Sequence, residues 1–212
     1  MIAAGDTLLI ATRNAGKTKE FAQAFAAIGV TVKDLREVDS IPEIDETGTT
    51  FAENALIKAK TVADLTGLPV LADDSGLCVD ALGGDPGVYS ARYAGEKATD
   101  SENNAKLLRE LGALSERPAV EEEGPEGKRL LSSARFVASL VLYEPATGEK
   151  TVAEGAVYGF IMDSASGEGG FGYDPLFYVP EFRQSMAEMS VAQKNKISHR
   201  GQALRALLEK LR

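Results

Sequence analysis

Two adjacent carboxylates, Asp73 and Asp74, follow an apolar run in residues 68–76 and are the residues best suited to chemistry. A run of this length is typical of a buried strand, and ligands of α/β proteins bind at the carboxyl ends of such strands. Neighbouring carboxylates repel one another, so the pair favours a bound cation such as Mg²⁺ or a shared proton. The alternative is a polar turn, Asp-Asp-Ser-Gly, that simply closes the strand.

A second candidate is the polar turn Thr12-Arg-Asn-Ala-Gly-Lys17, between a short apolar run and an amphipathic pattern that ends at Gly29. This order predicts a strand, a turn and a helix. Backbone N–H groups at the start of a helix bind anions, and Lys17, Thr12 and Asn14 would add side-chain contacts.

The same turn is one residue away from the phosphate-binding pattern G-x-x-x-x-G-K-[ST], because Ala11 stands where that pattern has its first glycine. A P-loop-like NTPase that releases phosphate therefore stays open as an alternative. It would leave the two later motifs without a role.

Those later motifs are Gly170-Phe-Gly-Tyr-Asp174 and Lys194-Asn-Lys-Ile-Ser-His-Arg200. Aromatic rings flanked by glycines let a flat base stack, and a carboxylate accepts from ring N–H groups. The second motif places His199 and Arg200 in the first turn of a helix, where cations oppose the helix dipole and a ligand role is favoured. An aromatic strand entry and a structural histidine are the alternatives.

The elements that must position these residues follow a strand–helix order. Strands are predicted at residues 7–11, 30–33 and 68–72, with a helix between the first two and another at 50–66, opened by the capping box Thr50/Glu53. This βαβαβ order favours an α/β fold. Further on, the pattern predicts a strand at 77–80, a helix at 99–111, a β-hairpin at 134–143 and 151–161, and a C-terminal helix capped by Ser198. Residues 115–129 have the composition of a surface insertion.

Composition sets the class of protein. The 212 residues, expected to form a single domain at 1–212 with two lobes possible, carry a net charge of −9, which argues against binding to nucleic acid polymers or anionic membranes. One cysteine, Cys78, cannot form an internal disulfide and fits a reducing compartment. No apolar stretch reaches the roughly 18 residues of a membrane span. We therefore expect a cytoplasmic protein with no membrane contact.

Taken in order, the motifs resemble the inosine/xanthosine triphosphate pyrophosphatase family, whose members hydrolyse non-standard purine nucleoside triphosphates. The resemblance covers the chain from Leu8 to about Leu208. The motifs that carry it are Thr12-x-Asn14-x-x-Lys17, Glu53-Asn54-Ala55 with Lys58, Ala72-Asp-Asp-Ser-Gly76, Gly87-x-Tyr-Ser-Ala-Arg92, Phe171-Gly-Tyr-Asp-Pro175 and Ser198-His-Arg200.

The resemblance implies a role for each matching residue. Asp74 is expected to be the proton acceptor and a ligand of Mg²⁺, and Asp45 the second metal ligand, with Glu46 beside it as the alternative. Asp73 is expected to support Asp74. The residues expected to bind substrate are Thr12, Arg13, Asn14, Ala15, Gly16, Lys17, Ser75, Phe171, Gly172, Tyr173, Asp174, Lys194, His199 and Arg200.

The expected fold is α/β, a mixed twisted sheet flanked by helices, with a central cleft and a smaller β-rich lobe. The expected reaction is hydrolysis of ITP, dITP or XTP to the monophosphate and pyrophosphate, which cleanses the nucleotide pool, and the resemblance implies a homodimer. A non-catalytic nucleotide-binding module is a further alternative, but it has no need of Asp73, Asp74 and an acidic loop together.

Overall fold

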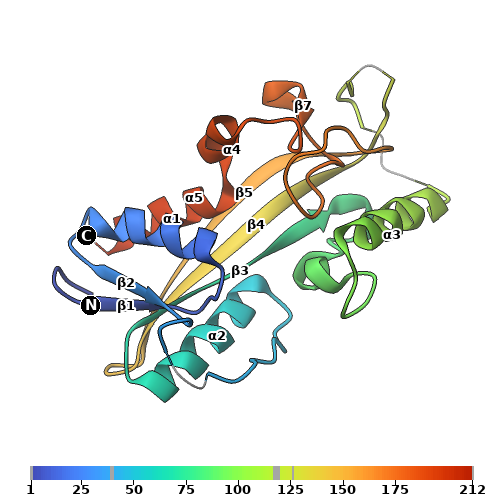
Figure 1. Cartoon of the computed structure of the whole chain (residues 1–212). Coiled ribbons are helices and arrows are strands. Elements are labelled where there is room, and N and C mark those ends of the chain that lie inside the picture. The colour runs from blue at the N-terminus through green and yellow to red at the C-terminus, as the bar shows by residue number, and fades with distance from the viewer. Residues whose placement is uncertain (1, 39–40, 117–119, 126, 212) are drawn as a thin grey trace. The chain divides into compact units, whose positions relative to one another are not determined.

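The computed structural model describes residues 2–38, 41–116, 120–125 and 127–211, and Figure 1 traces the chain. Part of the expected insertion at 115–129 lies outside these residues. The chain divides into two compact units, each built from discontinuous segments. The first unit comprises Met1–Asp74, Ala138–Gly155 and Arg200–Arg212, and the second comprises Ser75–Val137 and Ala156–His199.

The described strands form a mixed sheet in the order β2-β1-β3-β4-β5-β6-β7, which confirms the expected α/β class. Strands β1 and β2 are parallel, as are β1 and β3, whereas β5, β6 and β7 pair antiparallel. The strands are β1 (Thr7–Ile10), β2 (Thr31–Asp34), β3 (Val70–Val79), β4 (Leu130–Glu144), β5 (Glu149–Met162), β6 (Phe177–Val179) and β7 (Gln184–Ser185). The predicted hairpin is β4 and β5, both longer than the sequence pattern indicated.

In the first unit, helices cover both faces of the strands (Figure 1). Helices α1 (Ala15–Ala26) and α5 (His199–Lys210) lie on one face, and α2 (Phe51–Thr66) lies on the other. Residues of β1 alternate accordingly, since Leu8 and Ile10 pack in the core under α1 and α5 while Leu9 packs under α2. The side chains of β1 therefore pack alternately into the two layers.

Capping residues set both ends of helix α2. Thr50 and Glu53 form the expected capping box, and Gly67 ends the helix in the left-handed conformation at φ 70°. Small side chains such as Ala55, Ala59 and Ala63 are fully buried on the face that meets the sheet. This close packing brings the polar residues of the same face near the strands.

The second unit has its own core, built around β3, β4 and β5 residues such as Leu77, Leu131 and Ile161. It also contains α3 (Asp100–Ala113) and α4 (Val191–Ile197), so it is not exclusively β. Helix α3 begins directly after its N-cap, Thr99, which forms a capping box with Glu102, close to the predicted start. Short 3₁₀ helices lie at Asp80–Leu82, Gly87–Arg92 and Pro180–Phe182.

One expectation is wrong. The segment Asp-Asp-Ser-Gly was expected to end a strand, but β3 continues through it from Val70 to Val79. Ion pairs hold both oxygens of Asp73 on one face of the strand and one oxygen of Asp74 on the other, and the strand continues through them without a turn. Asp73 and Asp74 are thus strand residues and not loop residues.

Among the described residues, no helix combines the length and the apolar character needed to cross a membrane.

Candidate active site

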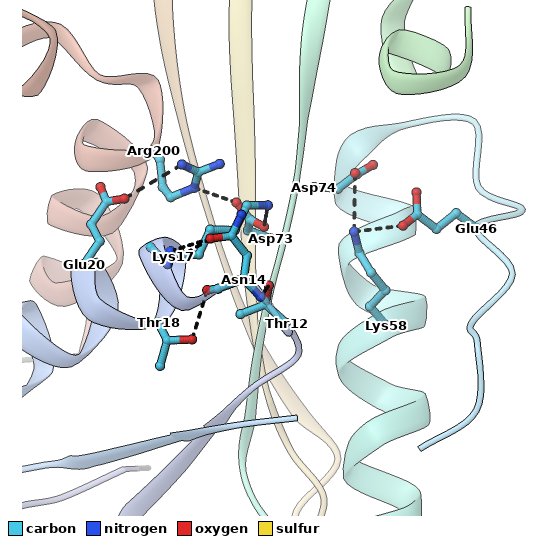
Figure 2. Close-up of polar contacts among 11 residues, drawn as sticks. Thr12, Asn14, Lys17, Thr18, Glu20, Glu46, Lys58, Asp73, Asp74 and Arg200 are labelled. Carbon is cyan, nitrogen blue, oxygen red and sulfur yellow. Dashed lines mark hydrogen bonds and ion pairs between the residues drawn. The ribbon is translucent and has the colours of Figure 1, made fainter. Parts of the chain in front are cut away.

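Side chains of consecutive strand residues point to opposite faces of a sheet, and this rule separates Asp73 from Asp74. Leu71, two residues before Asp73, packs in the core under α1 and α5, and Ala72, two residues before Asp74, packs in the core under α2. Figure 2 shows Asp73 facing Lys17 and Arg200, and Asp74 facing Lys58. The two carboxylates therefore do not share one cation, contrary to the expectation from their adjacency.

Asp73 holds two cationic side chains. Lys17 Nζ donates to its Oδ1 at 2.7 Å and Arg200 Nε donates to its Oδ2 at 2.7 Å. Burial alone would raise the pKa of Asp73, but Arg200 and Lys17 hold that pKa well below its ordinary value. We call Lys17, Asp73 and Arg200 the Asp73 cluster; it fixes one cation from α1 and one from α5.

The turn before α1 is held by its own side chains. Asn14 is the N-cap, and its Oδ1 accepts from the backbone N–H groups of Gly16 and Lys17. Thr12 Oγ1 accepts from the N–H of Asn14 at 3.1 Å, and Ala15 is the first helical residue. The amide nitrogen of Asn14 is then the group this side chain can offer to an anion.

Arg13, expected to bind substrate, donates to a backbone carbonyl. Its guanidinium Nη2 lies 2.9 Å from the oxygen of Ile41, in the acidic loop before α2 (residues 37–48). In the described residues Arg13 thereby links the turn before α1 to the loop before α2.

Asp74 lies in a different environment. Lys58 Nζ, from α2, lies 3.3 Å from Asp74 Oδ1 and 3.1 Å from Glu46 Oε1 (Figure 2). Burial raises the pKa of the Asp74 carboxyl, Lys58 opposes this increase, and the charge of Glu46 adds to it. Asp74 Oδ2 is buried and has no hydrogen-bond partner among the described residues. We call Glu46, Asn54, Lys58 and Asp74 the Asp74 cluster.

The donor set of the Asp74 cluster fits a hard divalent cation. The ammonium of Lys58 contacts both carboxylates, so Asp74 and Glu46 lie close enough to share one positive charge. Carboxylate oxygens are the ligands that Mg²⁺ prefers, and the unpartnered Oδ2 of Asp74 leaves an acceptor for a further contact. Within the described residues, no three Asp, Glu, His or Cys side chains form a preassembled metal group.

Asp45 and Glu46 differ in placement. The side chain of Asp45 is exposed, whereas Glu46 is partly buried and reaches Lys58. Asp45 as the second metal ligand stays a prediction, and the observed pairing supports its alternative, Glu46.

In the second unit, Asp174 anchors the loop that carries the aromatic motif. It is 7% exposed, accepts from Lys194 Nζ at 2.8 Å, and accepts from the backbone N–H of Phe171 at 3.3 Å. The ring of Phe171 is 77% exposed, which is unusual for a large apolar side chain and leaves its face available. Tyr173 is buried instead, and its hydroxyl donates to the carbonyl of Ser90.

Helix α3 holds the same loop from both sides of one residue. The backbone N–H of Gly172 donates to Asp100 at 2.6 Å, and the carbonyl of Gly172 accepts from Asn104 at 2.8 Å. Sequence reasoning missed Asp100 and Asn104. Their spacing of four residues at the start of a capped helix was a usable signal for two polar side chains on one face.

The remaining predicted residues are placed as follows. His199 stacks on Phe136, with ring centroids 5.6 Å apart and an interplanar angle of 15°. Ser75 follows Asp74 in β3 and is partly exposed. The structure thus joins Lys17 to Arg200 through Asp73, and Phe171 to Lys194 through Asp174. Lys58, present in a motif but given no role, proves to be the partner of Asp74.

Comparison with known proteins gives a consistent result. The model of the Ham1 family matches residues 8–210. The dITP/XTP pyrophosphatase of Streptococcus pyogenes serotype M18 is 52% identical over 205 residues, 97% of this chain and 58% of that protein. The protein of the same name from Streptococcus mutans serotype c is 50% identical, over 97% of this chain and 59% of its own length. The chain therefore spans a little over half the length of these relatives.

Solved structures match over nearly their whole length. The Staphylococcus aureus Ham1 protein has a TM-score of 0.83 and 40% identity, covering 97% of each chain. A HAM1 protein from Coxiella burnetii has a TM-score of 0.84 and 40% identity, over 97% of this chain and 98% of that one. The nucleoside-triphosphatase, or dITP/XTP pyrophosphatase, of Mycobacterium abscessus has a TM-score of 0.77 and 40% identity, over 95% and 98%. These matches confirm the resemblance read from the motifs: the chain belongs to the Ham1 family.

Proposed function

We propose that this protein hydrolyses non-standard purine nucleoside triphosphates such as dITP, ITP and XTP to the monophosphate and pyrophosphate, with Mg²⁺ as cofactor. The observation that carries the proposal is the separation of Asp73 from Asp74. One carboxylate fixes two cationic side chains, and the other keeps a buried oxygen without a partner among the described residues. The names of the streptococcal and mycobacterial relatives support the same activity.

Each cluster has a part in this reaction. Lys17, held by Asp73, would neutralise phosphate oxygens, and the Asn14 amide would donate to them. Asp74 would accept the proton of the attacking water while that water forms a bond to the α-phosphorus. The bridging P–O bond to the β-phosphate then breaks, and pyrophosphate leaves with the bonding electrons. Mg²⁺, held by Asp74 with Glu46 or Asp45, would supply charge neutralisation and polarisation of the phosphate.

The Phe171 loop is assigned to the base. An exposed aromatic face suits stacking, and Asp174 suits ring N–H groups. His199 and Arg200 are expected to donate to the 6-oxo group of hypoxanthine or xanthine. Adenine has an amino group at that position and would leave those donors unpaired, which a buried site penalises strongly.

The P-loop alternative finds no support. In P-loop enzymes the backbone N–H groups of the turn cradle phosphate, whereas here Gly16 and Lys17 donate to the side chain of Asn14. A non-catalytic nucleotide-binding module would not require the Asp74 cluster. We also propose a homodimer that acts in the cytoplasm; light scattering coupled to size exclusion tests the assembly.

One assay separates these alternatives. The protein is incubated with ITP, XTP, dITP, ATP or GTP in the presence of Mg²⁺, and the product is identified as pyrophosphate, phosphate or none. Release of pyrophosphate from ITP, dITP and XTP, abolished by a chelator, is the expected result. Release of phosphate, or equal turnover of ATP and ITP, would contradict the proposal.

A further inference from the structure

Helices α2 and α3 begin with the same local sequence and the same local geometry. The pattern is T-x-x-E-N, as Thr50 to Asn54 in α2 and Thr99 to Asn103 in α3. Both threonines are N-caps, and both glutamates complete a capping box. In both helices the asparagine that follows is buried, 0% exposed for Asn54 and 3% for Asn103. Asn103 can therefore serve as a reference for the role of Asn54.

Asn103 uses its whole amide on the backbone. Its Oδ1 accepts from the N–H of Ala94 at 2.8 Å, and its Nδ2 donates to the carbonyl of Ala91 at 3.1 Å. Both bonds tie the loop before α3 to the helix. Asn103 therefore serves as a structural clamp.

Asn54 uses only half of its amide in this way. Its Oδ1 accepts from the N–H of Gly48 at 2.8 Å, so the oxygen must face the loop and the orientation of the amide is fixed. Its Nδ2 is buried and has no hydrogen-bond partner among the described residues. A buried donor without a partner carries a large desolvation cost, which a clamp of the Asn103 kind avoids.

The group beside Asn54 is the Asp74 carboxyl. The side chain of Asn54 lies next to this carboxylate and interacts with it. Asp74 Oδ2 is itself buried without a partner among the described residues. Lys58, four residues after Asn54 and on the same face of α2, contacts the other oxygen, Oδ1. The helix thus presents an ammonium and an amide to one carboxylate.

We propose that Asn54 is a positioning residue for Asp74: Oδ1 holds the acidic loop through Gly48, and Nδ2 is reserved to orient the Asp74 carboxylate. One side chain then sets the placement of the loop that carries Glu46 and the orientation of the carboxylate that faces it. This inference rests on the proposed function, because the placement matters for a shared cation and for proton transfer.

The experiment compares Asn54→Ala with its matched control Asn103→Ala. Each variant loses a buried clamp, so each should lower Tm by about 5 °C. Mg²⁺ binding is measured by calorimetry without nucleotide. Asn54→Ala should bind Mg²⁺ about 10- to 100-fold more weakly, whereas Asn103→Ala should bind it as the wild type does.

A second variant, Asn54→Asp, keeps an oxygen for the N–H of Gly48 and replaces the donor with a second carboxylate oxygen, whose charge repels the Asp74 carboxylate. Its kcat for dITP should fall about 10-fold or more, with KM close to the wild-type value. Wild-type kcat in Asn54→Asp, or equal Mg²⁺ binding by the two alanine variants, would overturn the inference and leave the proposed function standing. A wild-type protein that neither binds Mg²⁺ nor releases pyrophosphate would instead overturn the proposed function, and the inference with it.

Discussion

At the scale of single residues, Asp73 and Asp74 are neighbours in the chain but differ in their ionic partners and in the direction of their pKa shifts. Asp73 is fully engaged by Lys17 and Arg200, and the pKa of its carboxyl is lowered. The pKa of the Asp74 carboxyl is raised, its cationic partner is Lys58, and one of its oxygens has no hydrogen-bond partner among the described residues. A carboxylate that must accept a proton needs the second kind of environment.

The first prediction concerns Asp74. Asn at this position keeps the shape and removes the base, so Asp74→Asn should lower kcat by about 10³-fold with a small change in KM. Steady-state kinetics with dITP measures both constants. Asp80→Asn, at a carboxylate that pairs with Arg135, is the control and should keep wild-type kcat. A variant at Asp74 that retains most of its turnover would contradict the assignment of the base.

The second prediction concerns Asp73. Its replacement by Asn removes the counter-ion of the partly buried Lys17 and leaves Arg200, among the ion pairs of the described residues, with only its longer contact to Glu20, at 3.8 Å. Asp73→Asn should therefore destabilise the fold by about 3 kcal/mol. Because Lys17 and Arg200 lose their anchor, KM for the triphosphate should also rise. Urea unfolding and steady-state kinetics measure the two effects. An increase in KM without loss of stability would show that Asp73 acts on substrate and not as an anchor.

At the scale of elements, the loop before α2 depends on a close approach of backbone to helix. A Cβ added at Gly48 would lie 2.6 Å from the Cβ of Glu53 and 2.7 Å from Asn54 Oδ1. The Cβ of Glu53 cannot move away without its helix, and Asn54 Oδ1 is held by the N–H of Gly48. The acidic loop therefore requires glycine at this position.

The third prediction follows from this contact. Gly48→Ala should displace the loop, lower kcat and lower Tm by several degrees. The control is Gly112→Ala, because a Cβ there meets no atom within 4 Å and the residue lies inside α3. That change should be neutral or stabilise the protein by about 0.5–1 kcal/mol, as alanine does in helices. Thermal unfolding and steady-state kinetics measure Tm and kcat for both variants. Equal changes in the two variants would refute the steric explanation.

Strand β2 is tied to α1 by a buried carboxylate. Asp34 is 0% exposed, accepts from Thr18 Oγ1 at 2.5 Å, and accepts from Arg36 through several donors. Hydrogen bonds from Arg36, the largest contribution, and from Thr18 outweigh burial and lower the pKa of Asp34 from 3.8 to about 2.

The fourth prediction is a pH dependence. A carboxyl with a lowered pKa in the folded state contributes stability above its unfolded pKa, and this contribution is lost as pH falls toward the folded value. Wild-type stability in urea should therefore decline between about pH 4 and pH 2, and Asp34→Asn should lose less over this range. Parallel curves for the two proteins across the window would exclude a role for Asp34 in acid unfolding.

The sequence predicted those elements whose ends are marked by neighbouring residues. Thr50 with Glu53, and Gly67, marked the limits of α2, since capping depends on neighbouring residues. The continuation of β3 was not predicted, because four polar or small residues resemble a turn and the cations that satisfy them are distant in sequence. Lys17 lies 56 residues from Asp73 and Arg200 lies 127 residues away.

The sequence predicted the residues of the candidate site better than it predicted which of them contact one another. Asp74, Lys17 and Arg200 were selected by type and motif, but the period-two alternation of a strand was not applied to Asp73 and Asp74. Asn54 was part of a motif, but its proposed role was not predicted, because that role depends on a side-chain donor that the neighbouring backbone does not use. Such a property exists only after the chain has folded.

At the scale of the whole molecule, charge limits the partners. The chain carries −9 at pH 7, although the Asp73 cluster gathers two cations at one point. A small anion coordinated at close range can use these cations, whereas a polyanion meets the repulsion of the entire surface.

The fifth prediction tests this distinction. Fluorescence anisotropy should detect no binding of labelled duplex DNA at about 0.15 M salt. The same protein should bind a non-hydrolysable dITP analogue with Mg²⁺. Binding of DNA that weakens steeply with added salt would show a basic surface that the net charge conceals.

Strand β3 is aligned with β1 by two pairs, Leu9 with Val70 and Ile10 with Leu71. Because side chains alternate, a slip of one residue at this pairing would turn Asp73 toward α2 and Asp74 toward α1 and α5. The proposed base, Asp74, would then face Lys17 and Arg200, and Asp73 would face the acidic loop, although no residue of the candidate site had changed. The role of each carboxylate therefore depends on the register of β3 against β1. A deletion in the apolar core, at Val70 or Leu71, would change the candidate active site as much as a substitution within it.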